Sequence, residues 1–401
     1  MIKIGYLFDR IRDVKLSDYL SFFPMTAALI IKPFYRNKYV GTWLVCEEPG
    51  EARDNGYHFF KYMCEKQPQQ KCFYAIKKSS VDVKKVQSLG EIIEYGSVQH
   101  WLAYFLCEYN ISSQKGGKPN AATCAFMEMN GIFKPKNVFL QHGITKDHAE
   151  WLYADKCNFK YFITAAIPED DMIRKDYGFP DGIVQLCGFP RYDALESSKT
   201  KKNRILVMPT WRYWFNLKSK YGEGVERDFT KSEYLHKWLE FLNSEYLDQL
   251  IDKYDLNVVF FLHRNMQRYI DSFRNVNKKI TIASWKEYDI QNLLMTSALM
   301  VTDYSSVYFD MIYMKKPVIF YQFDEKIYRK YQYQEGWFDY HNNPFGKSID
   351  NPTGIIKEIR KYLESSMSVG NDYIDGYNLL FKYHDNDNSH RLFSLLSKER
   401  L

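Results

Sequence analysis

Short apolar runs, each followed by a segment with helical spacing, recur along the chain and constrain the fold more than any other feature. The runs have the length of strands, and the links to the following helices are short. Alternation of this kind favours parallel sheets with helices on both faces, the doubly wound α/β class. The runs lie at 39–45, 72–76, 138–140, 161–164, 205–208, 258–262, 298–301 and 317–320.

The length of the chain predicts two domains, because 401 residues are too many for one ordinary core. The stretch 196–204 is polar and basic and contains no apolar residue, which predicts an interdomain linker at 197–204. The domains would then span 1–196 and 205–370. A polar helical segment, 371–401, would cross back to the first domain. Two such domains of similar size, joined once, form the pattern of GT-B glycosyltransferases.

The net charge and the cysteine content exclude few classes of protein. A net charge of +6 fits anionic substrates or an anionic membrane face, but also a protein with no special partner. The seven cysteines form no C-x-x-C pair and are odd in number, which disfavours a disulfide framework or a zinc site and favours reduced thiols in the cytoplasm. No apolar run reaches the roughly 18 residues that span a bilayer, and residues 1–9 lack the features of a signal peptide. We therefore expect a soluble or peripheral protein.

The segment 22–31 is the most hydrophobic of the chain, and Lys32, Arg36 and Lys38 follow it. An apolar segment with a basic border is typical of a helix that lies in a membrane interface. A short apolar segment with a proline also fits a helix buried in the first domain. The sequence leaves both alternatives open.

The stretch 298–312 predicts an anion site. A strand-type run ends at Thr302, and Ser305 or Ser306 stands before an apolar helical segment that it could cap. Free backbone N–H groups and the positive end of a helix would then face an anion, above all a phosphate. The simpler alternative is a capping serine without a ligand, which is common in this fold class.

His142 stands where the run 138–140 ends and is followed by Gly143. Open α/β sheets bind ligands at the carboxyl ends of their strands, and a histidine there can accept a proton near neutral pH. The glycine would allow a substrate to approach the backbone closely. A histidine that binds a loop carbonyl is the alternative.

His263 repeats this pattern after the run 258–262 and is followed by Arg264. Such a cationic pair at a strand end can neutralise a diphosphate, with arginine as a fork and histidine as a single donor. The alternative is a basic surface patch, since other basic residues lie nearby.

Two further residues stand in loops after strands. Arg212, in the stretch 209–212, is expected to reach freely into a cleft, and Asp193 is expected to sit in a loop or to cap a helix. Neither a P-loop nor a Rossmann glycine fingerprint is present. The D-x-D pattern at 385–387 lies in the polar tail and is interpreted as a solvated turn, so no metal site is predicted.

Several short motifs occur together in one order, from about residue 43 to about residue 339. They lie at 54–60, 141–143, 188–193, 209–212, 263, 289–294, 302–306, 316–321, 328–329 and 335–339. This ordered set resembles the CDP-glycerol glycerophosphotransferases, which are the teichoic-acid primases and polymerases of Gram-positive bacteria and their relatives in capsule synthesis. Within that family the chain resembles the shorter enzymes.

The resemblance implies a GT-B fold with CDP-glycerol in the interdomain cleft, and an in-line transfer of glycerol phosphate that releases CMP. The family's base falls on His142. Its donor-binding residues fall on His263 and on the stretch 302–306. The full expected set is catalytic His142 and His263, with substrate-binding Gly143, Arg212, Arg264, Thr302, Asp303, Ser305, Ser306 and Arg329. No cofactor, metal or nucleic acid is expected.

The acceptor implied by the family is a lipid-linked or growing polymer, so the enzyme would work at the inner face of the cell membrane. The chain differs from many members at two places, with Gln141 before the first histidine and 261–262 before the second. CDP-ribitol is therefore an alternative donor. A GT-B sugar transferase that uses a nucleotide sugar and a non-catalytic polysaccharide-binding subunit are the remaining alternatives.

Overall fold

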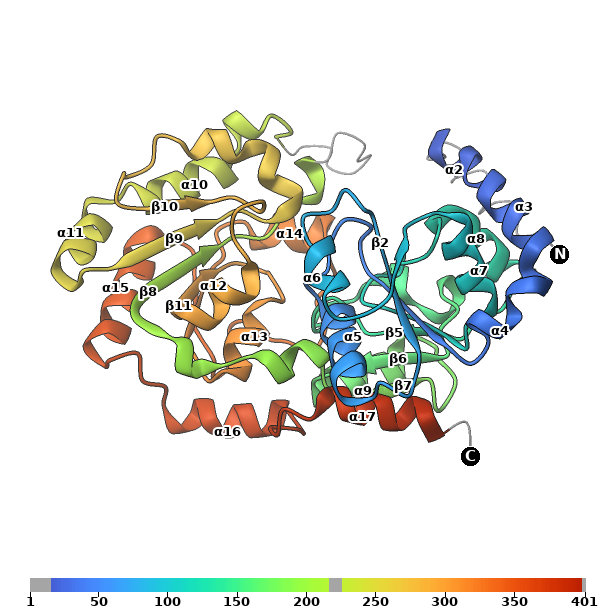
Figure 1. Cartoon of the computed structure of the whole chain (residues 1–401). Helices are drawn as coiled ribbons and strands as arrows, with labels where there is room; N and C mark the ends of the chain where they lie inside the picture. Colours follow the sequence, from blue (N-terminus) through green and yellow to red (C-terminus); the bar gives the residue numbers. More distant parts are fainter. Residues whose placement is uncertain (1–15, 216–225, 399–401) are drawn as a thin grey trace. The chain divides into compact units, whose positions relative to one another are not determined.

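The computed structural model describes residues 16–215 and 226–398 (Figure 1). The chain forms two compact units. The first unit comprises 1–142, 150–194 and 383–401, and the second comprises 143–149 and 195–382. Residues 1–9, on which the signal-peptide prediction rested, lie outside the described residues.

The first unit holds, among its described residues, a seven-stranded parallel sheet with the order β3-β2-β1-β4-β5-β6-β7. Its strands are β1 (Trp43–Cys46), β2 (Cys72–Ile76), β3 (Ile92–Glu94), β4 (Tyr109–Ser112), β5 (Asn137–Phe139), β6 (Tyr161–Thr164) and β7 (Val184–Leu186). Its helices are α2 (Leu16–Leu20), α3 (Phe22–Ile31), η1 (Lys32–Tyr35), α4 (Arg36–Tyr39), α5 (Asn55–Lys66), α6 (Val83–Gln87), α7 (Val98–Leu106), α8 (Ala121–Met129), η2 (Glu150–Leu152), η3 (Ala154–Lys156), α9 (Ile167–Asp176), η4 (Pro190–Ala194) and α17 (Asn388–Ser397).

The second unit holds a six-stranded parallel sheet, counted over the same described ranges, with the order β10-β9-β8-β11-β12-β13. Its strands are β8 (Lys201–Met208), β9 (Asn257–Phe261), β10 (Thr281–Ala283), β11 (Ser297–Thr302), β12 (Val318–Tyr321) and β13 (Ser348–Ile349). Its helices are η5 (Ser197–Lys199), η6 (Tyr213–Phe215), η7 (Phe229–Lys231), α10 (Glu233–Leu242), α11 (Glu245–Tyr254), η8 (Arg264–Phe273), α12 (Ile290–Thr296), α13 (Tyr308–Tyr313), α14 (Glu325–Tyr331), α15 (Pro352–Glu364) and α16 (Asn371–Leu380).

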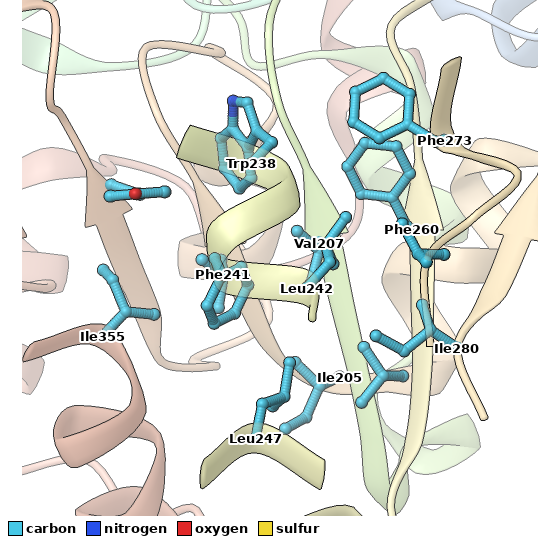
Figure 2. Close-up of a cluster of buried hydrophobic side chains, with 14 of the residues drawn as sticks. Ile205, Val207, Trp238, Phe241, Leu242, Leu247, Phe260, Phe273, Ile280 and Ile355 are labelled. Atoms are coloured by element: carbon cyan, nitrogen blue, oxygen red, sulfur yellow. The ribbon is translucent and has the colours of Figure 1, made fainter. Parts of the chain in front are cut away.

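The predicted α/β class with two parallel-sheet domains is confirmed. The central strands are apolar without alternation because helices cover both faces of a parallel sheet. Figure 2 shows one side of the second sheet, where Ile205 and Val207 of β8 meet Trp238 and Phe241 of α10. Trp238 has no exposed surface, so its truncation to alanine would cost about 3–5 kcal/mol of stability.

The expected linker at 197–204 is wrong, because β8 begins at Lys201. The polar residues that suggested a linker form the exposed start of this strand, whose buried part begins at Ile205. The expected return of 371–401 to the first domain needs a similar correction. Helix α16 belongs to the second unit, and only the chain from Tyr383 onward belongs to the first.

Asp193 caps the last helix, which agrees with one of the two roles expected for it. Its carboxylate accepts hydrogen bonds from the backbone N–H groups of Asn388, at 2.9 Å, and Ser389, at 2.8 Å. Gly188 makes this contact possible, because a Cβ at this position would lie 1.8 Å from the Asn388 Oδ1 atom. The motif at 188–193 therefore fixes α17 to the first unit.

Helix α3 has two different apolar sides. Ala28 is fully buried where α3 packs against α7, and Met25 and Ile31 also contact that core. Phe23 and Ile30, in contrast, are 74% and 69% exposed. Among residues 16–215 and 226–398, no helix combines the length and the apolarity that are needed to cross a bilayer.

Candidate functional site

His142 lies just beyond the carboxyl end of β5, and its imidazole is bound to a carboxylate. The Nδ1 atom is 2.5 Å from Oδ2 of Asp54, while the His142 side chain is 63% exposed. In the neutral imidazole, Nδ1 carries the proton that it donates to Asp54, and Nε2 keeps its lone pair. The partner of Nδ1 therefore prepares Nε2 to accept a proton from a ligand.

Asp54 is the residue before α5, and the start of this helix is attached to the histidine's own strand end. The Asp54 carboxylate caps the helix by accepting from the N–H of Asn55 at 2.8 Å. The Asn55 side chain donates to the carbonyl oxygen of Gln141 at 2.8 Å. The fully buried Asn55 thus holds Asp54 close to His142.

Arg191, in η4, is the third member of this group. Its guanidinium Nη1 atom lies 3.2 Å from Oδ1 of Asp54 and donates to the carbonyl oxygen of His142 at 2.8 Å. Arg191 is 6% exposed, so its charge is shielded little by water. It therefore fixes the carboxylate and the histidine backbone with one side chain.

The pKa values of this group follow from its charges. The negative charge of Asp54 raises the pKa of His142 above its ordinary value, although partial desolvation of the ring and the charge of Arg191 act in the opposite direction. Burial alone would raise the pKa of Asp54, but His142 and Arg191 outweigh it and hold that pKa below its ordinary value. Burial, with the nearby Asp54 charge, also raises the pKa of Glu47 to about 7. Glu47 accepts from the N–H of Tyr57 at 2.7 Å and so supports the start of α5.

His263 lies at the end of β9 in the second unit and has the opposite arrangement. Its Nδ1 atom accepts a hydrogen bond from the N–H of Asn265 at 3.2 Å. In the neutral ring the proton is therefore on Nε2, which can donate to a ligand oxygen. The ring also stacks on Trp211, with the ring centroids 6.4 Å apart.

The surroundings of His263 include a small cavity and a cation. Trp211 and Asn265, which both contact His263, also line a cavity of about 260 Å³. Arg264 is exposed, and its guanidinium carbon lies 5.8 Å from the centroid of the Trp285 ring. Arg268 lines the cavity from the same helix, η8. The cationic character expected at 263–264 therefore extends along this end of the sheet.

The expected capping by Ser305 or Ser306 needs correction. The residue that precedes α13 is Val307, and no side chain caps this helix, which has six residues. Ser305 is buried and its Oγ atom accepts from the N–H of Val307 at 3.4 Å, while Ser306 is partly exposed. So short a helix contributes little dipole, which leaves the hydroxyl of Ser306 as the accessible polar group of the stretch 302–306.

Arg212 lines the cavity beside Trp211, but its side chain is not free, and that part of the expectation is wrong. The residue is 1% exposed, and its Nε atom donates to Oδ2 of Asp324 at 2.7 Å. Its Nη2 atom lies 2.9 Å from Oδ2 of Asp303. Its guanidinium is thus shared between two buried carboxylates that follow β11 and β12.

Asp303 and Thr302 are also buried and bound within the second unit. Asp303 accepts from the N–H of Thr210 at 2.8 Å, and the Thr302 hydroxyl donates to the carbonyl of Met208 at 2.6 Å. These bonds join the end of β11 to the end of β8, its neighbour in the sheet, and to the loop after β8. In this structure both residues shape the loop that carries Ser306, and neither exposes a polar atom to solvent, since both are 0% exposed.

Gly143 and Arg329 lie in the second unit as well. A Cβ added to Gly143 would be 2.8 Å from Oγ of Ser306, so any side chain at this position would force the Ser306 hydroxyl to move. Arg329 is mostly buried and its Nη1 atom donates to Oδ1 of Asp147 at 2.6 Å. Arg329 is therefore engaged by the chain itself.

The structure groups the expected residues into two sets. His142 stands in the first unit with Asp54 and Arg191, which the sequence analysis did not select as functional. Both lie in motifs at 54–60 and 188–193, but nothing local shows that they meet His142. The second set, in the second unit, contains Gly143, Arg212, His263, Arg264, Thr302, Asp303, Ser305, Ser306 and Arg329.

Comparison with known proteins identifies relatives for most of the sequence. Residues 30–398 match the model of the family described as CDP-glycerol:poly(glycerophosphate) glycerophosphotransferase. The minor teichoic acid biosynthesis protein GgaB of Bacillus subtilis (strain 168) is 31% identical over 368 residues, which cover 88% of this chain and 39% of that protein. The teichoic acid poly(ribitol-phosphate) polymerase of Bacillus spizizenii is 34% identical over 236 residues, which cover 53% of this chain and 35% of that protein.

The fold agrees with these matches. The wall teichoic acid polymerase TagF superposes with a TM-score of 0.65 at 15% identity, over 96% of this chain and 98% of the TagF chain. Together with two parallel α/β units, this establishes a GT-B type fold. The chain spans well under half the length of the two curated relatives described above. The family match covers nearly all of the sequence, so the resemblance inferred from the motifs is confirmed: the chain belongs to the CDP-glycerol:poly(glycerophosphate) glycerophosphotransferase family.

Proposed function

We propose that this protein transfers glycerol phosphate from CDP-glycerol to a hydroxyl of a lipid-linked or polymeric acceptor and releases CMP. The observation that carries the proposal is the pair formed by His142 and Asp54. An exposed imidazole whose Nδ1 is bound to a carboxylate is the arrangement of a general base, because Nε2 can then accept a proton and the carboxylate stabilises the imidazolium that forms.

In this reaction the acceptor hydroxyl oxygen attacks the phosphorus that bears glycerol. A new P–O bond forms, the P–O bond to CMP breaks, and the proton of the hydroxyl passes to Nε2 of His142. CMP leaves with the electron pair of the broken bond. Positioning and charge stabilisation supply the rest of the catalysis.

The donor-binding role falls to the second unit. His263 would donate from Nε2 to a diphosphate oxygen, and Arg264 would add a positive charge. Ser306 supplies a hydroxyl that is partly exposed. A TagF variant that shares this fold has been soaked with CDPG, which supports CDP-glycerol as the donor.

Analysis of the products by mass spectrometry tests the proposal. Purified protein is incubated with CDP-glycerol, CDP-ribitol or a UDP-sugar, each with a synthetic lipid-linked acceptor. We expect CMP and an acceptor heavier by glycerol phosphate. Transfer from the UDP-sugar alone would indicate a sugar transferase. No product from any donor would contradict catalysis and favour a binding subunit.

CDP-ribitol is the second candidate donor. Its support is the likeness to a poly(ribitol-phosphate) polymerase, which is 34% identical over the matched 236 residues. The same experiment separates the two polyols, because ribitol phosphate adds a larger mass to the acceptor. A product from CDP-ribitol alone would replace glycerol with ribitol in the proposal.

We also propose that the enzyme binds the inner face of an anionic membrane through helices α3 and η1. The support is the outer side of these helices, where Phe22 is 50% exposed and Phe34 is 85% exposed, together with Phe23 and Ile30. The exposed basic residues Arg36 and Lys38 follow directly. Apolar burial would supply most of the affinity, and each basic residue near anionic lipid adds about 1 kcal/mol.

Flotation with liposomes tests this attachment. The double variant Phe23→Ser/Ile30→Ser removes two apolar side chains that the fold does not bury, so it should stay folded and lose flotation with anionic vesicles. Leu379→Ser is the matched control, because Leu379 is 75% exposed on α16. Flotation of the double variant at the level of the parent would contradict the attachment.

A further inference from the structure

Residues 143–149 leave the first sheet after β5 but belong to the second unit. Their backbone is bound there on both sides of Asp147. The N–H of His148 donates to the carbonyl of Gln334 at 3.1 Å, in an antiparallel bridge. The N–H of Trp337 donates to the carbonyl of Lys146 at 3.1 Å. Segment 143–149 is therefore attached to the second unit by backbone hydrogen bonds.

The motif at 335–339 provides this attachment. A Cβ added to Gly336 would lie 2.3 Å from the carbonyl oxygen of Lys146 and 2.9 Å from Cα of Asp147, so only glycine fits. The indole Nε1 of Trp337 donates to the carbonyl of Thr145 at 2.9 Å. Gly336 thus allows the backbone at 336 to lie close to the backbone of segment 143–149, and Trp337 adds one hydrogen bond to it.

A buried ion cluster adds to these bonds. Lys146 and Asp147 are 4% and 6% exposed. The Asp147 carboxylate binds the Lys146 ammonium through one oxygen and the Arg329 guanidinium through the other, the latter at 2.6 Å. Lys146 also lies over the ring of Tyr340, 5.1 Å from its centroid. Removing Arg329 would leave this buried cluster incomplete, which is costly in a site shielded from water.

Gly143, the first residue of the segment, contacts Ser306 and directly follows His142, the proposed base. Gly143 lies against Ser306, because a Cβ built on Gly143 would be only 2.8 Å from the Ser306 Oγ atom. His142 precedes Gly143 by a single peptide bond, and a trans peptide fixes consecutive Cα atoms 3.8 Å apart. Whatever immobilises Gly143 therefore also restricts the backbone of His142.

We propose that Gly336, Arg329 and Asp147 are positioning residues, which hold segment 143–149 and through it fix His142 for proton transfer. This inference rests on the proposed function, because it assumes that His142 is the base. None of the three needs to touch substrate. Their loss should slow turnover and leave donor affinity unchanged, since the side chains of Thr302 and Asp303 are bound to Met208 and Thr210 and not to segment 143–149.

Gly336→Ala is the sharpest test. Its methyl group would collide with the Lys146 carbonyl and displace the segment. We expect kcat to fall about 100-fold, the cost of a misplacement near 1 Å, with the Kd for CDP-glycerol unchanged by calorimetry. Gly370→Ala is the matched control, because a Cβ at Gly370 meets nothing within 4 Å. Normal kcat in Gly336→Ala would overturn the proposal.

Arg329 provides an independent test through its charge. Arg329→Gln should lower kcat and speed hydrogen exchange at the amides of 143–149, and Arg329→Lys should recover part of both, because it restores a cation beside Asp147. Arg274→Gln is the control, since Arg274 pairs with Asp271 on the exposed surface. A loss of CDP-glycerol binding in Arg329→Gln would instead assign Arg329 to the donor site and overturn its positioning role.

The two proposals can fail separately. If His142→Ala turns over normally, the base assignment fails, and the positioning role fails with it. If His142→Ala is inactive while Gly336→Ala and Arg329→Gln are normal, the proposed function stands and only the positioning role is wrong.

Discussion

His142 and His263 both follow the carboxyl end of a parallel strand, yet the Nδ1 atoms of their rings are bound in opposite ways. Each follows a parallel strand at its carboxyl end, β5 in one case and β9 in the other. At His142 the Nδ1 atom faces a carboxylate, and at His263 it faces a backbone N–H. The first arrangement leaves Nε2 as a proton acceptor and the second makes it a proton donor. Under the proposed function, a histidine after a strand end would thus act as a base or as an anion ligand according to the group that binds its Nδ1 atom.

The largest expected effect separates the two histidines directly. His142→Ala should reduce kcat by about 10²- to 10⁴-fold, because it removes the general base, and should leave the Kd for CDP-glycerol unchanged. Steady-state kinetics and calorimetry on the same preparation check both parts. Near-normal turnover in this variant would show that the base is another residue.

The second prediction concerns stability and the buried ion cluster of Arg212, Asp303 and Asp324, which adjoins Trp211, the residue on which His263 stacks. Arg212→Ala should lower the free energy of unfolding by about 3–5 kcal/mol, since Asp303 and Asp324 would be left as buried charges without a cation. Chemical denaturation measures the loss. Arg274→Ala, which breaks an exposed pair, should change stability little. Equal effects of the two variants would contradict the role assigned to the cluster.

The third prediction tests the carboxylate that distinguishes His142. Asp54→Asn should lower kcat by about 10²-fold or more, because the amide no longer stabilises the imidazolium. The charge of Asp54 raises the pKa of His142, so the free base is available only above that raised pKa. Without the charge the pKa falls, and the acidic limb of the kcat/KM profile should move to lower pH. An unmoved limb would mean that His142 does not govern it.

The smallest expected effect is a loss of CDP-glycerol affinity in variants of the proposed donor site. His263→Ala and Ser306→Ala should each weaken CDP-glycerol binding by about 1.5–3 kcal/mol, the value of a hydrogen bond to a charged group. We expect a much smaller change in kcat than in His142→Ala. Unchanged affinity in both variants, measured by calorimetry, would move the diphosphate site away from β9 and β11.

The sequence alone was sufficient to predict the features that depend on neighbouring residues along the chain, namely the fold class and the residues at strand ends. Strand-length apolar runs and intervening helices predicted two parallel α/β domains, because the pattern of burial in such a sheet repeats locally. The positions of His142 and His263 at the carboxyl edges of the two sheets were predicted in the same way, since a residue shortly after a strand lies at that edge. Asp193 was recognised as a possible cap from its loop.

Tertiary structure alone decided what each of these residues touches. Asp54 lies 88 positions from His142 in the chain, and Asp324 lies 112 positions from Arg212. No local pattern indicates that the first pair would orient an exposed imidazole or that the second would bury a guanidinium. The same reason explains why the linker prediction at 197–204 was wrong. Residues 201–204 are polar, but they belong to a strand that pairs with other strands. Composition reports how polar a side chain is, but its partner and its protonation depend on segments that only the folded sheet brings together.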